Sequence, residues 1–270
     1  MSESESQTKI TELAVKDIAS FMSAIVHVSR QFNNTRAWWR GQRDASWKLM
    51  PSLYRLGFEE KEVNLNGRFR LMAKARKGEV PSNTDPLAWL FLMQHYRLPT
   101  RLLDWSQSPL VALYFAIEKP DDSDAAMWAL SPTDLNNLEA QIPSICMPGS
   151  DIIGQLGVQA FRPPSEKRDS RIISVLTEEA DPRQMVQQSA FTLHGRGNPL
   201  DQRDEANKFL VKVRIPAKAK AGLREAIALL GISRASLFPD LENLALEIAS
   251  LNYQTKSIVE ELVDESKGNS

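Results

Sequence analysis

The chain has 270 residues, of which 42% are hydrophobic and 25% are charged, with a net charge of −1. This length and composition suit one large domain that buries a core of its own. The near-zero net charge excludes a global electrostatic field that would draw the protein to nucleic acid or membranes, so any such contact needs a local basic patch.

Cysteine and histidine usage limits the chemistry further. Cys146 is the single cysteine, so no internal disulfide forms, and the three histidines are too scattered to give zinc-ligand spacing. Residues 1–9 are acidic and polar, unlike a secretion signal, and no apolar run approaches the roughly 20 residues that span a bilayer. We therefore expect a cytoplasmic protein with no bound metal, no membrane partner and a disordered tail over residues 1–9.

The first predicted element is a helix over residues 15–32, within a supporting segment over residues 10–35, because apolar residues recur there at helical spacing. Trp38 and Trp39 then favour a short strand. Gly41 either ends this strand or admits a close backbone approach. A helix over about residues 60–77 follows. Its basic face is either a solvated surface or a phosphate contact, and comprises Arg68, Arg70, Lys74, Arg76 and Lys77.

Capping residues mark the next two helices. Asp85 and Pro86 predict a helix that runs to about residue 96, with aspartate as the N-cap and proline at the first position. Ser106 or Ser108 is expected to cap a second, apolar helix. Further strands are expected over residues 124–131, 172–176, 190–194 and 208–215, and further helices after Ser131, from Pro216 to about residue 230, and over residues 241–251.

Two later segments give specific expectations. Residues 141–167 are rich in proline and glycine and predict an irregular excursion or a mobile lid. In the helix over residues 241–251, Leu244, Ile248 and Leu251 are expected to face inward. Strands and helices alternate only loosely, which favours an α+β fold. We expect a single main domain over residues 36–255, with a small, mostly antiparallel mixed sheet flanked by helices, and a frayed tail over residues 256–270.

The densest cluster of polar side chains lies over residues 94–106, directly before the apolar run at residues 110–117. A polar cluster fused to a buried helix can hold reactive groups on a rigid support. It can equally close a loop through an Arg–Asp pair beneath a tryptophan. Arg40 has the same two interpretations: it pairs with Asp104 in the core, or it holds a phosphate bidentately. We expect Arg40 and the loop over residues 100–106 to line one concave surface that grips an anionic small molecule.

Five segments resemble the FRG domain family, which is named for a Phe/Tyr-Arg-Gly motif. They are Trp-Arg-Gly-Gln at 39–42, and the segments at 47–55, 93–106, 191–194 and 237–241. Trp39 occupies the aromatic position of the motif, and Arg97 stands where the family usually has glycine. The resemblance covers roughly residues 36–250 and implies a fold, but it does not imply an activity.

A more distant resemblance is to ADP-ribosyltransferases of the Arg-Ser-Glu type and implies a similar fold. Arg40 matches their aromatic-Arg-Gly strand, and Ser106 with residues 111–116 matches their Ser-rich strand and apolar helix. The comparable later strand offers Gln187, Gln188 and Ser189 in place of glutamate. A carboxylate is needed to stabilise an oxocarbenium-like transition state. Asp104 is the best placed by motif, and the weaker candidates are Glu178, Glu179 and Glu247.

These resemblances imply a set of site residues. The catalytic candidates are Arg40, His95, Asp104 and Ser106. The nucleotide-contacting candidates are Arg40, Gly41, Gln42, Gln94, Thr100, Arg101, Trp105, Gln188 and His194. Both histidines can equally serve backbone hydrogen bonds, and the tryptophan can equally be a core lid. NAD would be a substrate, with no permanently bound cofactor.

Three functions remain open at this point. The first is an ADP-ribosyltransferase-like or NAD-cleaving toxic effector in conflict between bacteria and phages. The second is a nucleotide- or partner-binding module that uses the same cleft without turnover. The third is a nucleic-acid-acting protein such as a nuclease, although a metal-dependent nuclease usually needs more carboxylates than the single aspartate of this motif. The sequence does not define a protein or nucleic-acid target.

Overall fold

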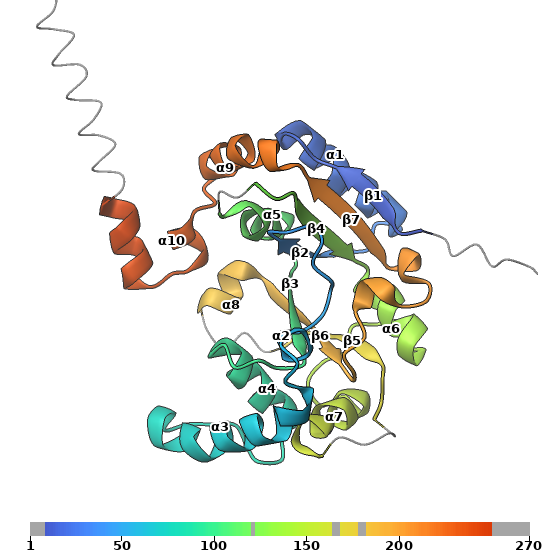
Figure 1. The fold of residues 1–270 in the computed structure, drawn as a ribbon, viewed down its shortest axis with the longest axis vertical. Helices are drawn as coiled ribbons and strands as arrows, with labels where there is room; N and C mark the ends of the chain where they lie inside the picture. The colour runs from blue at the N-terminus through green and yellow to red at the C-terminus, as the bar shows by residue number, and fades with distance from the viewer. Residues whose placement is uncertain (1–8, 120–121, 164–167, 178–181, 250–270) are drawn as a thin grey trace, which may run out of the picture.

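The computed structural model describes residues 9–119, 122–163, 168–177 and 182–249. A single seven-stranded sheet organises them, in the order β1-β7-β4-β2-β3-β6-β5 (Figure 1). The strands are β1 (Thr11–Ala14), β2 (Trp38–Gln42), β3 (Leu102–Ser106), β4 (Ala125–Leu130), β5 (Ile172–Val175), β6 (Ser189–His194) and β7 (Leu210–Ile215). Only the β1–β7 pair is parallel among these strands. The predicted α+β fold with a mostly antiparallel mixed sheet is therefore confirmed.

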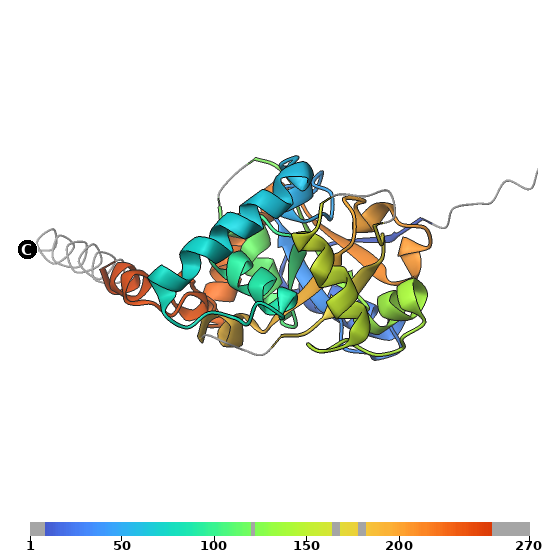
Figure 2. The ribbon, with the colours of Figure 1, turned by 90° about the horizontal axis from the view of Figure 1, so that it is seen from below.

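Helices cover both faces and one end of this sheet. The α-helices are α1 (Ile18–Gln31), α2 (Ser52–Arg55), α3 (Glu62–Lys77), α4 (Pro86–His95), α5 (Pro109–Ile117), α6 (Pro132–Ala140), α7 (Asp151–Val158), α8 (Pro182–Gln187), α9 (Lys220–Leu229) and α10 (Arg234–Leu237). Short 3-10 turns are η1 (Glu59–Lys61), η2 (Gln159–Phe161), η3 (Leu200–Gln202), η4 (Ala206–Lys208) and η5 (Ala217–Ala219). Figure 2 shows α3, α4 and α7 together at the end of the molecule that Figure 1 places lowest.

Strand β2 lies in the middle of the sheet and divides the core between its faces. Successive side chains of a strand point to opposite faces, so Trp38 and Trp39 enter two different hydrophobic clusters. Trp39 packs with residues of α1, α5 and α9, whereas Trp38 packs with Leu49, Leu135 and Phe209 on the other face. This two-sided burial explains why two adjacent tryptophans stand in one short strand.

Gly41 admits the close backbone approach that the sequence left open, and the strand continues to Gln42. A Cβ atom at this position would lie 2.0 Å from the carbonyl oxygen of Ala112 and 2.6 Å from the amide nitrogen of Ala116. Both atoms belong to the backbone of α5. Only glycine therefore lets α5 lie directly on β2.

The capping predictions are confirmed at two helices. The Asp85 side chain accepts a hydrogen bond from the Ala88 amide at the start of α4, with Pro86 in the first turn. Ser108, rather than Ser106, caps α5 by accepting from the Val111 amide. These caps fix where each helix begins and hence where the polar segment between them lies.

Four expectations differ from the structure. The helix expected from residue 15 is preceded by a strand, β1, which pairs with β7. Residues 102–106 of the loop expected over residues 100–106 are a strand, β3, which pairs along its length with β6 and at one position with β2. The segment over residues 141–167 is not irregular throughout, because Ile152, Ile153 and Leu156 of α7 are buried in a core cluster with α4. Residues 164–167 of that segment lie outside the described part.

The fourth difference concerns the C-terminal helix. Residues 241–249 are helical, but Leu244 and Ile248 are 46% and 52% exposed, so the prediction that they face inward is wrong. Leu251 and the tails expected at residues 1–9 and 256–270 fall outside the described residues, except for Lys9. Among the described residues, no helix combines the length and the apolar composition that crossing a membrane requires.

Candidate active site

A cleft of about 490 Å³ opens where β2 and β3 meet α4, α5 and α8. Its charged lining residues are Arg40, Arg43, Arg97, Arg183, Asp104 and Glu118. Its aromatic lining residues are Trp39, Trp47, Phe91, Trp105, Phe115 and Phe191. Four arginines therefore face two acids, in a chain whose net charge is −1. A concave site with this charge balance and this aromatic surface favours an anionic ligand with planar rings.

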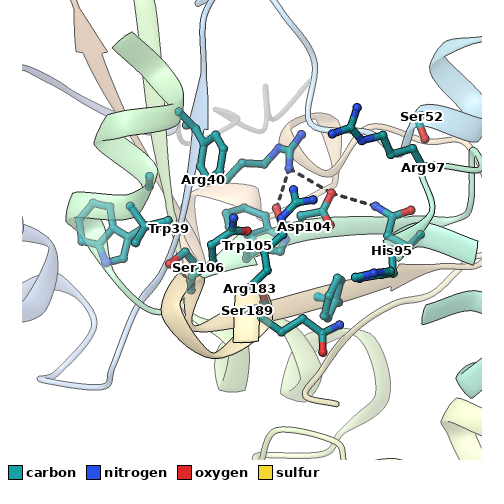
Figure 3. Close-up of a pocket in the computed structure, with 18 of the residues that line it drawn as sticks. Trp39, Arg40, Ser52, His95, Arg97, Asp104, Trp105, Ser106, Arg183 and Ser189 are labelled. Atoms are coloured by element: carbon teal, nitrogen blue, oxygen red, sulfur yellow. Dashed lines mark hydrogen bonds and ion pairs between the residues drawn. The ribbon is translucent and has the colours of Figure 1, made fainter. Parts of the chain in front are cut away.

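Arg40 and Asp104 meet at the centre of this cleft (Figure 3). Nη1 of Arg40 donates to the backbone oxygen of Asp104 at 2.6 Å and lies 3.9 Å from carboxylate oxygen Oδ2. The arginine side chain is 20% exposed and the aspartate side chain 55% exposed. The predicted pair is therefore real, but it lies at an open surface with its carboxylate accessible, not in the core.

Burial lowers the pKa of the Arg40 guanidinium, and the neighbouring Asp104 partly opposes this effect. An arginine still keeps its proton at neutral pH, because its ordinary pKa lies far above neutrality. Its Nε is buried and has no hydrogen-bond partner within the described residues. The structure therefore holds a partly desolvated cation at the floor of the cleft, where its attraction for an anion is less weakened by water.

A chain of hydrogen bonds positions the Asp104 carboxylate. Nε2 of Gln94 donates to Oδ2 of Asp104 at 2.9 Å, and the Thr100 hydroxyl donates to Oε1 of Gln94 at 2.6 Å. The Leu102 amide in turn donates to the Thr100 hydroxyl at 3.1 Å. Thr100 is fully buried and does not line the cleft. It therefore acts on the carboxylate only through Gln94, as a positioning residue.

Ser106 lines the cleft, but its hydroxyl is engaged by the backbone. It donates to the carbonyl of Gln187 at 2.7 Å and accepts from the Ser108 amide at 3.0 Å. A hydroxyl has one proton to donate, so Ser106 cannot also donate to a ligand without breaking this bond. The serine ties β3 to the segment that joins α8 to β6.

His95 and Trp105 both line the cleft. His95 ends α4, and its ring meets the Tyr96 ring edge-on with centroids 4.9 Å apart. Trp105 is almost fully buried, and its indole Nε1 donates to the Thr192 hydroxyl at 3.1 Å. Trp105 is thus mainly a core residue that presents one side to the cleft.

Four further predicted contacts lie outside the cleft. Gln42 is buried, where its amide accepts from the Trp128 indole and donates to the Lys48 carbonyl. Arg101 is fully buried in an ion pair with Glu62, with Nε and Oε1 2.7 Å apart. Gln188 follows α8 in a left-handed conformation, and its side chain accepts from Arg36. His194 is fully buried. Gln42, Arg101 and His194 are therefore used inside the fold, and Gln188 is used at its surface.

His194 provides a test of this core assignment. Burial lowers its pKa to about 3, and Arg203, Arg101 and Arg40 add to the effect. The unfolded chain binds a proton below about pH 6.5, whereas the folded chain does not until about pH 3. The contribution of His194 to the free energy of unfolding should therefore be complete above pH 6.5. It should fall on acidification toward pH 3, by up to about 1.4 kcal/mol per pH unit.

Urea unfolding at a series of pH values measures this dependence. The slope should become shallower in His194→Gln, which cannot take up the proton. The exposed His27 supplies the matched control, and His27→Gln should keep the wild-type slope. Equal slopes in all three proteins would show that His194 titrates normally in the fold.

The sequence did not predict several of the cleft residues. Arg43 and Trp47 come from the connection between β2 and α2, and Arg97, Phe115 and Arg183 come from three other segments. Arg43 lies 5.6 Å from the centroid of the Trp47 ring, and Arg183 lies 4.7 Å from that of Phe238. Among these residues, only Arg97 was marked in the sequence, because it stands where the FRG motif usually has glycine.

The remaining acid candidates do not replace Asp104. Glu178 and Glu179 lie outside the described residues, and Glu247 does not line the cleft. Across the described part of the chain, no three His, Cys, Asp or Glu side chains are grouped to share a metal ion. Asp104 and Glu118 are the two carboxylates at the cleft, and Asp104 is the one beside Arg40.

The basic face of α3 is partly structural. Arg70 lies over the rings of Trp89 and Phe161, at 5.3 Å and 5.0 Å from their centroids, and donates to the Asn83 side chain. This arginine packs the helix against its neighbours. No specific contact of α3 favours nucleic acid over solvent.

Comparison with known proteins gives one match. The sequence model described as FRG domain matches residues 35–125, which contain β2, α4, β3 and α5. No curated protein and no solved structure matches the chain. The matched segment thus supplies both Arg40 and Asp104 of the cleft.

Proposed function

Since this chain carries an FRG domain whose matched segment supplies most of the cleft lining, we propose that the protein binds an NAD-type nucleotide there and cleaves its nicotinamide–ribose bond. The observation that carries the proposal is the placing of the Arg40 guanidinium beside the half-exposed Asp104 carboxylate. A cation for phosphate and an anion for a developing positive charge then lie within one site.

The lining supports a dinucleotide over a simple anion. Guanidinium groups pair with phosphate oxygens through two parallel hydrogen bonds, and four arginines line the cleft. Aromatic side chains such as Trp47 and Phe115 offer surfaces on which adenine or nicotinamide rings can stack. The cleft volume of about 490 Å³ lies within the range of small-molecule sites, roughly 300–1,000 Å³.

Asp104 is the proposed catalytic residue. As the bond between nicotinamide nitrogen and ribose carbon breaks, the bonding electrons leave with nicotinamide and positive charge develops on the ribose. A nearby carboxylate stabilises that charge. Water then adds to the ribose carbon and releases one proton, so NAD and water give ADP-ribose, nicotinamide and a proton. Gln94 holds the Asp104 carboxylate in position for this step.

A direct assay incubates the purified protein with NAD and measures free nicotinamide by chromatography. Asp104→Asn should lower the rate about 100-fold or more, because the amide cannot offset positive charge. Asp17→Asn is the matched control, since it makes the same carboxylate-to-amide change at the cap of α1, outside the cleft. It should leave the rate unchanged.

The outcomes separate the candidate functions. Binding of NAD by calorimetry without nicotinamide release would favour a nucleotide-binding module that uses the same cleft. The absence of both binding and release would refute the proposal. A toxic effector in conflict between bacteria and phages is the biological role that fits NAD cleavage. In that case, expression of the wild type should arrest growth and lower cellular NAD, and Asp104→Asn should do neither.

A further inference from the structure

We infer that Arg97 is a phosphate-contacting residue of the cleft, held by a strained backbone with its charge uncommitted until a ligand binds. This inference deepens the proposed function and rests on it. It assigns to the NAD-type ligand a second phosphate contact besides Arg40 in the same cleft (Figure 3).

The backbone of Arg97 is in the left-handed region, with φ at +63°. Residues other than glycine rarely adopt this backbone conformation, because their Cβ atom crowds the following carbonyl. The conformation closes α4: the Arg97 amide donates to the Gln94 carbonyl at 2.9 Å, and the Leu98 amide donates to the Met93 carbonyl at 3.0 Å. A glycine would close the helix in the same way without strain. The turn therefore explains the conformation but not the arginine.

The side chain gives no structural reason either. Arg97 is exposed and lines the cleft. Within the described residues, its guanidinium forms no hydrogen bond or ion pair, whereas Arg40 bonds to Asp104 and Arg43 lies over Trp47. A strained residue whose guanidinium forms no hydrogen bond or ion pair within the described residues is best explained by a contact to a ligand.

The chemistry of that partner follows from the group and its place. A guanidinium is a planar donor that fits the oxygens of a phosphate, and strain persists mainly where it serves a functional site. Figure 3 shows Arg97 directed into the same part of the cleft as Arg40 and Asp104. The Asp104 carboxylate accepts from Gln94 and lies 3.9 Å from Nη1 of Arg40, and within the described residues it forms no ion pair with Arg97, which leaves Arg97 for an anion brought by the ligand.

The test uses Arg97→Gly and Arg97→Lys in the full chain, with ADP-ribose and adenosine as probes in calorimetry. Arg97→Gly should weaken ADP-ribose binding about tenfold or more, the usual effect of losing a charged hydrogen bond. It should leave adenosine binding unchanged, because adenosine has no phosphate. Arg97→Lys keeps the charge and should weaken ADP-ribose binding less than Arg97→Gly does.

Thermal unfolding gives a second measurement, in which Arg97→Gly should gain stability although it loses affinity. Arg97→Gly should raise Tm by about 2–4 °C, because it removes the strain, while Arg97→Lys should leave Tm unchanged. A lower Tm in Arg97→Gly would make the arginine structural and overturn the inference. Wild-type affinity for ADP-ribose in Arg97→Gly would also overturn it, with the proposed function intact. Failure of the wild type itself to bind ADP-ribose would overturn the proposed function and this inference together.

Discussion

Replacing Glu62 with alanine is expected to destabilise the fold by about 3–5 kcal/mol, because it leaves buried positive charge without its partner. Glu62 and Arg101 are both fully buried, and their side chains form two hydrogen bonds. Nη1 of Arg168 also lies 3.6 Å from Oε2 of Glu62. Glu59 gives Arg168 a second carboxylate, with Oε1 3.9 Å from its Nη1, so the removal of Glu62 mainly leaves the buried Arg101 guanidinium without a carboxylate in a medium of low polarity.

The free energy of unfolding in urea measures this effect, with the midpoint compared at constant m-value. Glu60→Ala is the matched control, because Glu60 is exposed in the turn just before α3. Its change should stay within about 0.5 kcal/mol. A loss of under 1 kcal/mol in Glu62→Ala would mean that water or a shifted side chain replaces the carboxylate.

Replacing Gly41 with alanine should destabilise the protein by about 3 kcal/mol or more, at the upper end of overpacking effects. The added methyl group would overlap the Ala112 carbonyl and crowd the Ala116 amide. Both are backbone atoms of α5, so no side-chain rotation relieves the overlap. Helix α5 would have to lift off β2, which disturbs the cluster formed with α1 and α9.

Thermal and urea unfolding measure the loss of stability, and the control substitution should change stability in the opposite direction. Gly222 lies inside α9, and a Cβ atom there would meet nothing within 4 Å. Gly222→Ala should therefore stabilise the protein by about 0.5–1 kcal/mol through helix propensity. If Gly41→Ala unfolded at the wild-type midpoint, the close packing of α5 on β2 would be disproved.

Local rules predicted the fold where local chemistry decides it. Asp85 and Ser108 cap helices because their side chains bond to amides only three residues away. The same rules missed β1, whose four residues take their conformation from β7, two hundred positions further along the chain. They also missed α7, because its two glycines lower helix propensity and its stability comes from packing on α4.

The sequence motifs allowed only part of the site to be predicted. Arg40 and Asp104 were identified because their residue types complement each other and both stand in motifs. Arg101 and His194 stand in such motifs too, yet they face the core, and sequence does not reveal on which side of a strand or turn a polar group is used. Arg183 joins the cleft through tertiary structure alone, so no local pattern marks it.

The position of the FRG match within the sheet has a consequence for experiments on fragments. Residues 35–125 contain β2 and β3 but stop where β4 begins and well before β6. In the sheet, β4 and β6 are the outer neighbours of those two strands. A fragment limited to the matched segment would expose the unpaired backbone N–H and C=O groups of β2 and β3 at both edges. We expect such a fragment to self-associate. The matched segment is therefore one part of a larger sheet, and we do not expect it to fold by itself.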